Sequence, residues 1–92
     1  MRFLVTPTFE RAVKKLHRLQ KLELDAAVRQ IGENPGIGDA KVGDLAGISV
    51  YKFRMNKQLC LLAYRVLDTT SIKLLTLGQH ENFYRDLKRQ EK

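Results

Sequence analysis

Four side chains in the second half of the chain are of types that bind phosphate or transfer protons. His80 has an unperturbed pKa near neutrality, so it can accept or give a proton under physiological conditions. Tyr84, four residues further on, can stack on a splayed base or donate its hydroxyl. Lys52 and Arg54 alternate onto one face of a strand, and arginine can hold a phosphate with two parallel hydrogen bonds. These residues predict proton transfer beside a bound phosphate.

A predicted three-stranded meander positions them. Residues 48–55 alternate between apolar and polar side chains, which is typical of a strand. Residues 58–66 are almost continuously apolar and predict a central strand that is buried on both faces. Asn56-Lys57 is predicted as the turn between them, although the usual glycine is absent. A last strand at Ser71–Leu77 and a short helix at Glu81–Gln90 follow.

The first half of the chain predicts a strand and a helical hairpin. After the strand Arg2–Val5, Thr6-Pro7 predicts a helix start, because threonine caps helices and proline suits the first helical position. The hairpin joint is predicted near Gln20-Lys21, and the second helix at Leu22–Ile31. The glycine-rich segment 36–47 lacks the spacing of phosphate-binding loops, so it is predicted as a connector, with Lys41 as a residue that can line a site.

This order of elements predicts one α+β domain over residues 1–92. It comprises an N-terminal strand, a two-helix hairpin, a three-stranded antiparallel meander and a short C-terminal helix. We expect the helices to cover one face of the sheet.

Composition narrows the function classes. The chain carries a net charge of +7, and residues 51–92 contribute +5 of it, with 9 Lys/Arg against 4 Asp/Glu. Such an excess favours a polyanion or an acidic protein partner, although solubility alone is the alternative. No apolar run approaches the roughly 18 residues of a membrane span. With one cysteine, Cys60, and two distant histidines, His17 and His80, the sequence predicts neither an internal disulfide nor a zinc site. Cys60 is predicted to be a small buried side chain and His17 a surface residue.

The order and spacing of five short segments resemble the RelE/ParE superfamily of small toxins from bacterial type II toxin–antitoxin modules. The segments are Glu33-Asn34-Pro35, Leu45-x-Gly47, Tyr51-Lys52-Phe53-Arg54, Tyr64-Arg65-Val66 and Leu77-Gly78-Gln79-His80. The resemblance spans nearly the whole chain. It implies a cytoplasmic protein that a cognate antitoxin inhibits.

Within this superfamily, RelE-like members cut mRNA, typically in the ribosomal A site, and ParE-like members poison DNA gyrase. His80 and Tyr84 match the chain end of the YafQ-like nucleases. Many nuclease members carry an arginine three residues before the strand tyrosine, where this chain has Leu61. The extra His and Asp residues of YafQ-like members are also absent from Met55–Leu59.

The resemblance and the residues together predict a metal-independent endoribonuclease without a cofactor, which acts on mRNA in its ribosome-bound form and binds an antitoxin. The predicted catalytic residues are His80, Tyr84 and Arg54, and the predicted substrate-binding residues are Lys52, Arg85 and Lys88. Arg65 is excluded, because the predicted turn separates it from Arg54 by about 20 Å along the sheet. Two alternatives stay open: a ParE-like gyrase inhibitor, and an inactive member kept as the partner of a DNA-binding antitoxin.

Overall fold

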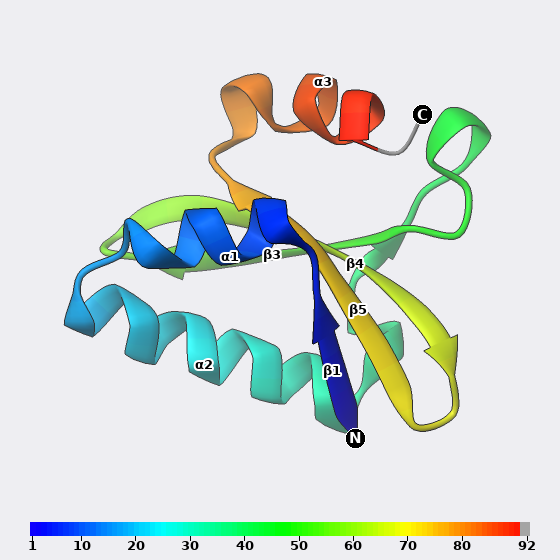
Figure 1. Ribbon diagram of the computed structural model, residues 1–92, viewed down its shortest axis with the longest axis horizontal. Coiled ribbons are helices and arrows are strands. Elements are labelled where there is room, and N and C mark those ends of the chain that lie inside the picture. The colour runs from blue at the N-terminus through cyan, green and yellow to red at the C-terminus, as the bar shows by residue number, and fades with distance from the viewer. Residues whose placement is uncertain (91–92) are drawn as a thin grey trace.

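The computed structural model describes residues 1–90, apart from the side chains of residues 80–82 (Figure 1). The strands are β1 (Arg2–Val5), β2 (Asp39–Ala40), β3 (Ser49–Met55), β4 (Gln58–Asp68) and β5 (Ser71–Gly78). The α-helices are α1 (Pro7–Lys14), α2 (Arg18–Glu33) and α3 (His80–Gln90), and two 3-10 helices are η1 (Pro35–Ile37) and η2 (Gly43–Leu45). The predicted α+β class is confirmed, and β2 is an additional short strand.

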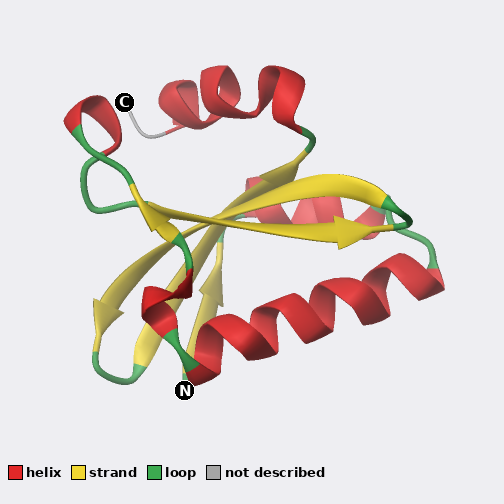
Figure 2. Cartoon of the chain, turned by 180° about the vertical axis from the view of Figure 1, so that it is seen from behind, coloured by secondary structure: helices red, strands yellow, loops and turns green. Residues whose placement is uncertain are grey.

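All five of these strands form one sheet in the order β1-β5-β4-β3-β2 (Figure 2). β3, β4 and β5 form the predicted antiparallel meander, whereas β1 joins the edge of β5 in parallel. β4 is the central strand, and its residues Cys60–Tyr64 are all buried, as its continuous apolar run predicts. The turn at Asn56-Lys57 is also confirmed, since Met55 pairs with Gln58.

The helical hairpin covers one face of the sheet. Thr6 caps α1 as predicted, and its hydroxyl accepts a hydrogen bond from the Phe9 amide at 3.0 Å. The buried residues of this core are Phe9, Leu24, Ile31, Met55, Cys60, Leu62, Tyr64, Ile72 and Leu74. This layer is the larger of the two cores, because two helices supply it.

α3 lies on the opposite face, so the expectation that all helices share one face is wrong (Figures 1 and 2). The buried residues of this second core are Leu45, Ile48, Val50, Leu61, Ala63, Leu75, Phe83 and Leu87. The physical reason lies in β4. Successive side chains of an apolar strand point to both faces, so both faces need a cover. Phe83 and Leu87, one turn apart on α3, provide the second one.

The joint of the helical hairpin differs from the predicted one. α1 ends at Lys14, and α2 already begins at Arg18, so the predicted joint near Gln20-Lys21 lies inside α2. His17 caps α2: its Nδ1 accepts from the Gln20 amide at 3.5 Å, and the Gln20 side chain accepts from the His17 amide at 3.1 Å. Histidine is not among the preferred capping residues, so the usual sequence pattern of a helix start is absent. His17 is a surface residue, as predicted.

Candidate functional site

Lys52 and Arg54 lie on the α3 face of β3, toward the hairpin end of the sheet. Lys52 pairs with Leu61 and Arg54 pairs with Leu59, so the predicted register is correct. Leu61 in turn pairs with Gly78 at the end of β5. Lys52, Leu61 and Gly78 therefore form one row across three strands, which spans about 10 Å at the usual strand spacing. Both basic side chains are exposed.

The start of α3 meets this row. His80 opens α3 two residues after Gly78, so its backbone lies at the same end of the sheet as Lys52. The side chain of His80 lies outside the described part of the structure. Its predicted catalytic role is therefore untested by the geometry.

Hydrogen bonds hold the neighbouring hairpin in place. The Arg54 guanidinium donates to the Lys57 carbonyl oxygen at 3.4 Å, and the Glu23 carboxylate of α2 accepts from the Asn56 amide at 3.0 Å. The Gln79 side-chain amide donates to the Gln58 side-chain oxygen at 2.5 Å, which joins the hairpin to the segment before α3. These contacts fix the strand end that presents Arg54.

Tyr84 lies one helical turn after His80 and faces a different basic residue, Lys41. The Lys41 ammonium is 5.3 Å from the centroid of the Tyr84 ring, within range of a cation–π interaction. Phe83 meets the same ring edge-on, with the centroids 5.3 Å apart and an interplanar angle of 90°. The structure therefore groups Tyr84 with the connector rather than with Arg54.

Arg85 and Lys88 are exposed on α3. The Arg85 guanidinium lies 3.7 Å from the carboxylate of its neighbour Asp86. Both side chains are well exposed, so this ion pair contributes little to stability, and another anion can replace Asp86 beside the guanidinium. Lys88 borders the same cavity as Lys41 and Tyr84.

Leu61 occupies the position where the resemblance places an arginine in many nucleases. Its side chain is 0% exposed, in the core beneath Phe83 and Leu87. Arg65 lies six residues beyond Leu59 on β4, next to the Gly47 turn, where its guanidinium lies 2.5 Å from the position a Cβ on Gly47 would take. The predicted separation of Arg65 from Arg54 along the sheet is confirmed by this register.

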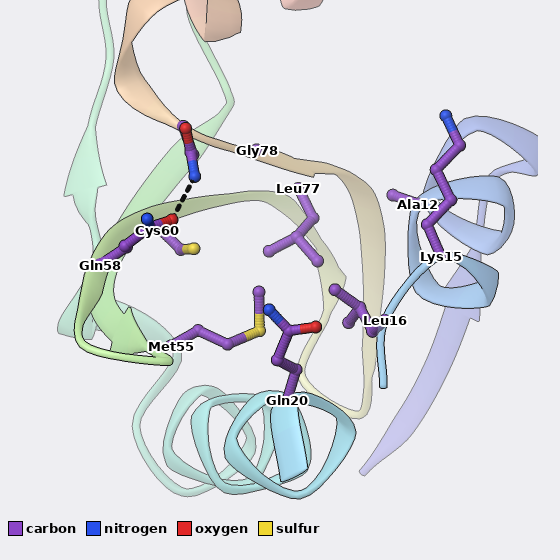
Figure 3. A pocket seen from close by; sticks show the side chains of 10 residues that line it. Ala12, Lys15, Leu16, Gln20, Met55, Gln58, Cys60, Leu77 and Gly78 are labelled. Atoms are coloured by element: carbon purple, nitrogen blue, oxygen red, sulfur yellow. Dashed lines mark hydrogen bonds between the residues drawn. The ribbon is translucent and has the colours of Figure 1, made fainter. Parts of the chain in front are cut away.

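The opposite face of the sheet contains a cavity of about 300 Å³ between α1, α2 and the strand ends (Figure 3). Its lining residues are Ala12, Lys15, Leu16, Gln20, Met55, Gln58, Cys60, Leu77, Gly78 and Gln79. Cys60 is buried, as predicted, and its burial raises the pKa of the thiol, with the nearby Glu23 carboxylate adding to the shift. A protonated thiol is a poor nucleophile, so Cys60 has a packing role.

Two further observations concern the described residues only. Among the residues whose side chains the structure describes, 1–79 and 83–90, no group of three His, Cys, Asp or Glu side chains is arranged to hold a metal ion. No helix in the described part of the chain is both long and apolar enough to cross a membrane.

Residues 3–88 match the family model described as the ParE-like toxin of the type II bacterial toxin–antitoxin system. The chain belongs to this family. The predicted resemblance to the RelE/ParE superfamily is thereby confirmed. No curated protein sequence matches this ParE-like toxin significantly.

Solved structures of RelE toxins share its fold. The free E. coli RelE toxin, as a double arginine-to-alanine mutant, aligns with a TM-score of 0.74 at 16% identity, covering 98% of this chain and 92% of that chain. The toxin–antitoxin complex RelBE from E. coli aligns at 0.68 and 18% identity, covering 87% and 96%. A RelBE-type complex from Mycobacterium tuberculosis aligns at 0.60 and 24% identity, covering 86% and 96%. At these identities the likeness establishes the fold of the ParE-like toxin and not its target.

Proposed function

We propose that this ParE-like toxin is a cytoplasmic endoribonuclease that cleaves mRNA on the ribosome without a metal ion. The observation that supports it best is the row Lys52–Leu61–Gly78. This row brings Lys52, a cation that could bind phosphate, and the start of the helix that carries His80 to one end of the sheet. Exposed lysine and arginine side chains near the helix start that carries a histidine are the residue types that RNA cleavage needs.

In the proposed reaction, the 2′-hydroxyl of one nucleotide attacks the adjacent phosphorus. The bond to the 5′-oxygen of the next nucleotide breaks, which leaves a 2′,3′-cyclic phosphate and a free 5′-hydroxyl. His80 accepts the proton that leaves the 2′-hydroxyl and returns it to the departing 5′-oxygen, and Arg54 and Lys52 offset the charge that grows on the phosphorane. Tyr84 orients the RNA, and Arg85 and Lys88 bind the flanking backbone.

We further propose that a cognate antitoxin binds and inhibits this protein. Two of the similar structures are toxin–antitoxin complexes, and the net charge of +7 suits a partner with acidic segments. If acidic segments of the antitoxin hold the complex together, high salt should separate the antitoxin from this basic toxin, because salt screens the attraction between opposite charges.

Primer extension on cellular mRNA after brief induction tests the nuclease. We expect new codon-phased cuts with the wild type and their loss in His80→Ala. His17→Asn is the matched control, because asparagine also caps helices and His17 lies at the α2 start. Growth arrest without cuts would contradict the nuclease, and cuts that persist in His80→Ala would move the proton transfer to another residue.

The second candidate is inhibition of DNA gyrase. The ParE-like family model and the buried Leu61 favour it, because this chain lacks the strand arginine of many nucleases. A gyrase supercoiling assay with purified toxin separates the two candidates. Inhibition that is unchanged in His80→Ala would support the gyrase target.

A further inference from the structure

A second cavity, of about 310 Å³, opens between the connector and α3. Its lining residues are Lys41, Val42, Asp44, Leu45, Tyr84 and Lys88. Figures 1 and 2 show the segment around η2 on the same side of the sheet as α3. The volume is at the lower end of ligand pockets, which run from roughly 300 to 1,000 Å³, and suits one planar base rather than a larger ligand.

The walls of this cavity suit an aromatic ring. Tyr84 is half-buried, and its edge-on contact with Phe83 fixes the plane of its ring. The rim includes Val42, an apolar side chain that is 85% exposed and adds contact area for a base. Unpaired RNA bases stack on tyrosine rings in this way.

The polar groups of the cavity distinguish between possible ligands. Lys41 and Lys88 supply two positive charges for a phosphate or ribose oxygen, whereas Asp44 supplies a carboxylate. That carboxylate repels an acidic peptide. It accepts hydrogen bonds from a nucleobase, and the Watson–Crick edge of guanine presents two adjacent N–H donors that match the two oxygens of one carboxylate.

The cavity also lies in line with the basic strand. The Lys41 amide donates to the Ile48 carbonyl oxygen at 2.8 Å, which fastens the connector beside β3. Ile48 and Lys52 both direct their side chains to the α3 face, four residues apart, or about 13 Å along the strand. A short stretch of single-stranded RNA spans this distance.

We propose that this cavity binds an unpaired guanine base of the RNA, stacked on Tyr84 in place of the Lys41 ammonium and hydrogen-bonded by Asp44, on one side of the cleaved bond. The inference rests on the proposed nuclease function for its substrate. It assigns to Asp44 a role in sequence preference, to Lys41 and Lys88 a role in binding the adjoining phosphate or ribose, and to Tyr84 that of a stacking platform.

Fluorescence anisotropy with labelled adenosine oligonucleotides of about ten residues, with or without one central guanosine, tests this binding directly. We expect the guanosine to tighten binding about tenfold, and Asp44→Asn to remove that difference. Tyr84→Leu should weaken binding about tenfold and Tyr84→Phe should not, because stacking needs the ring alone. Lys14→Gln, on the exposed face of α1, is the control for loss of one positive charge.

The chain contains no tryptophan, so Tyr84→Trp introduces into the cavity the one tryptophan of the variant, whose emission can be excited selectively over that of tyrosine. Its emission should be quenched by the guanosine oligonucleotide. Equal affinities of wild type and Asp44→Asn for both oligonucleotides would overturn the guanine site, as would binding that Tyr84→Leu leaves unchanged. Equal affinity for guanosine monophosphate and the oligonucleotide would overturn the assignment to RNA. The same conclusion would follow if polyglutamate alone produced the change in tryptophan emission.

These outcomes separate the inference from the proposed nuclease. Guanine-dependent binding without any RNA cleavage would contradict the nuclease and keep the site. Cleavage with no dependence of binding on Asp44 or Tyr84 would keep the nuclease and contradict the site.

Discussion

The Tyr64 hydroxyl donates a hydrogen bond of 2.6 Å to the carbonyl oxygen of Pro35. The same hydroxyl accepts a bond of 3.0 Å from the Gly38 amide, and the Tyr64 side chain is 0% exposed in the central strand. Gly38 must be glycine here, because a Cβ would lie 2.7 Å from the hydroxyl oxygen. One buried side chain of β4 therefore fixes the path of the connector that carries Lys41.

Tyr64→Phe tests this anchor. The substitution keeps the ring and removes the hydroxyl, which leaves the Pro35 carbonyl and the Gly38 amide without their hydrogen bonds to Tyr64. We expect the free energy of unfolding to fall by about 1–3 kcal/mol in urea titrations. Tyr51→Phe is the control, because Tyr51 is half-buried and no hydrogen bond of its hydroxyl is found within the described residues. A Tyr64→Phe protein as stable as Tyr51→Phe would contradict the anchor.

Alkaline pH should destabilise the fold through Cys60. Burial raises the pKa of its thiol above the ordinary value of 9.0, and Glu23 adds to the shift. Above pH 9 the unfolded chain loses this proton first, so stability is retained below that pH and falls as pH rises toward the folded-state pKa. The difference in unfolding free energy between wild type and Cys60→Ala should narrow above pH 9 in thermal or urea unfolding. A difference that stays constant up to pH 10.5 would refute this.

Burial acts in the same direction on Tyr64, whose pKa it raises above 10.0 against the opposing effects of hydrogen bonds from Gly38 and Ser49. The loss of stability from Tyr64 therefore begins about one pH unit above that from Cys60, because their ordinary pKa values are 10.0 and 9.0. Tyr64→Phe should remove the later loss.

The hairpin turn offers a stabilising substitution. Asn56 and Lys57 have φ of 55° and 66°, and they are the only non-glycine residues with positive φ among residues 1–90. The left-handed conformation costs lysine energy that glycine does not pay, so Lys57→Gly should stabilise the protein by about 0.5–1 kcal/mol. The Arg54 bond to the Lys57 carbonyl survives, because its acceptor is the backbone.

Thr69→Gly is the matched control, since Thr69 lies in the other strand turn and has no positive φ. Thr69→Gly should lower the free energy of unfolding by about 0.5–1 kcal/mol, because glycine there only increases the conformational entropy of the unfolded chain. Differential scanning calorimetry of both variants measures the contrast. Shifts of the same sign in both variants would contradict the strain at Lys57.

Local patterns predicted most of this fold, because they depend on neighbours in sequence. The capped start at Thr6-Pro7, the continuous apolar run of β4 and the turn at Asn56-Lys57 each carry their own physical cause. The start of α2 was misplaced because His17 caps it through a reciprocal bond with Gln20 that composition does not favour. The short strand β2 has no pattern of its own, since its place depends on the distant Tyr64 hydroxyl.

In the candidate site, too, the features that depend on sequence neighbours were predictable, and those that depend on distant contacts were not. The parity of β3 and the turn length correctly predicted that Lys52 and Arg54 share a face. The contact of Lys41 with Tyr84 depends on how α3 and the connector pack, and no periodicity links residues so far apart in sequence. The sequence gives no signal for Asp44 at this cavity for the same reason.

A substitution at Leu61 tests whether α3 must stay packed on this face of the sheet. Its side chain is fully buried with Phe83 and Leu87, at the strand position where many nuclease relatives are expected to have arginine. In Leu61→Arg, the guanidinium must either stay buried without a partner or reach water by lifting α3. Either outcome should cost at least about 3 kcal/mol of unfolding free energy. Amide hydrogen exchange should show lost protection across α3.

Leu61→Met separates this effect from a mere change of shape, because a similar volume without charge should cost less than about 1.5 kcal/mol and leave α3 protected. If α3 in Leu61→Arg exchanges as slowly as in the wild type, then the cover adapts to a charge and the face beneath it is polar enough to take an arginine. If only α3 loses protection, then the sheet is stable without its second layer, because the helices α1 and α2 bury the larger core on the other face.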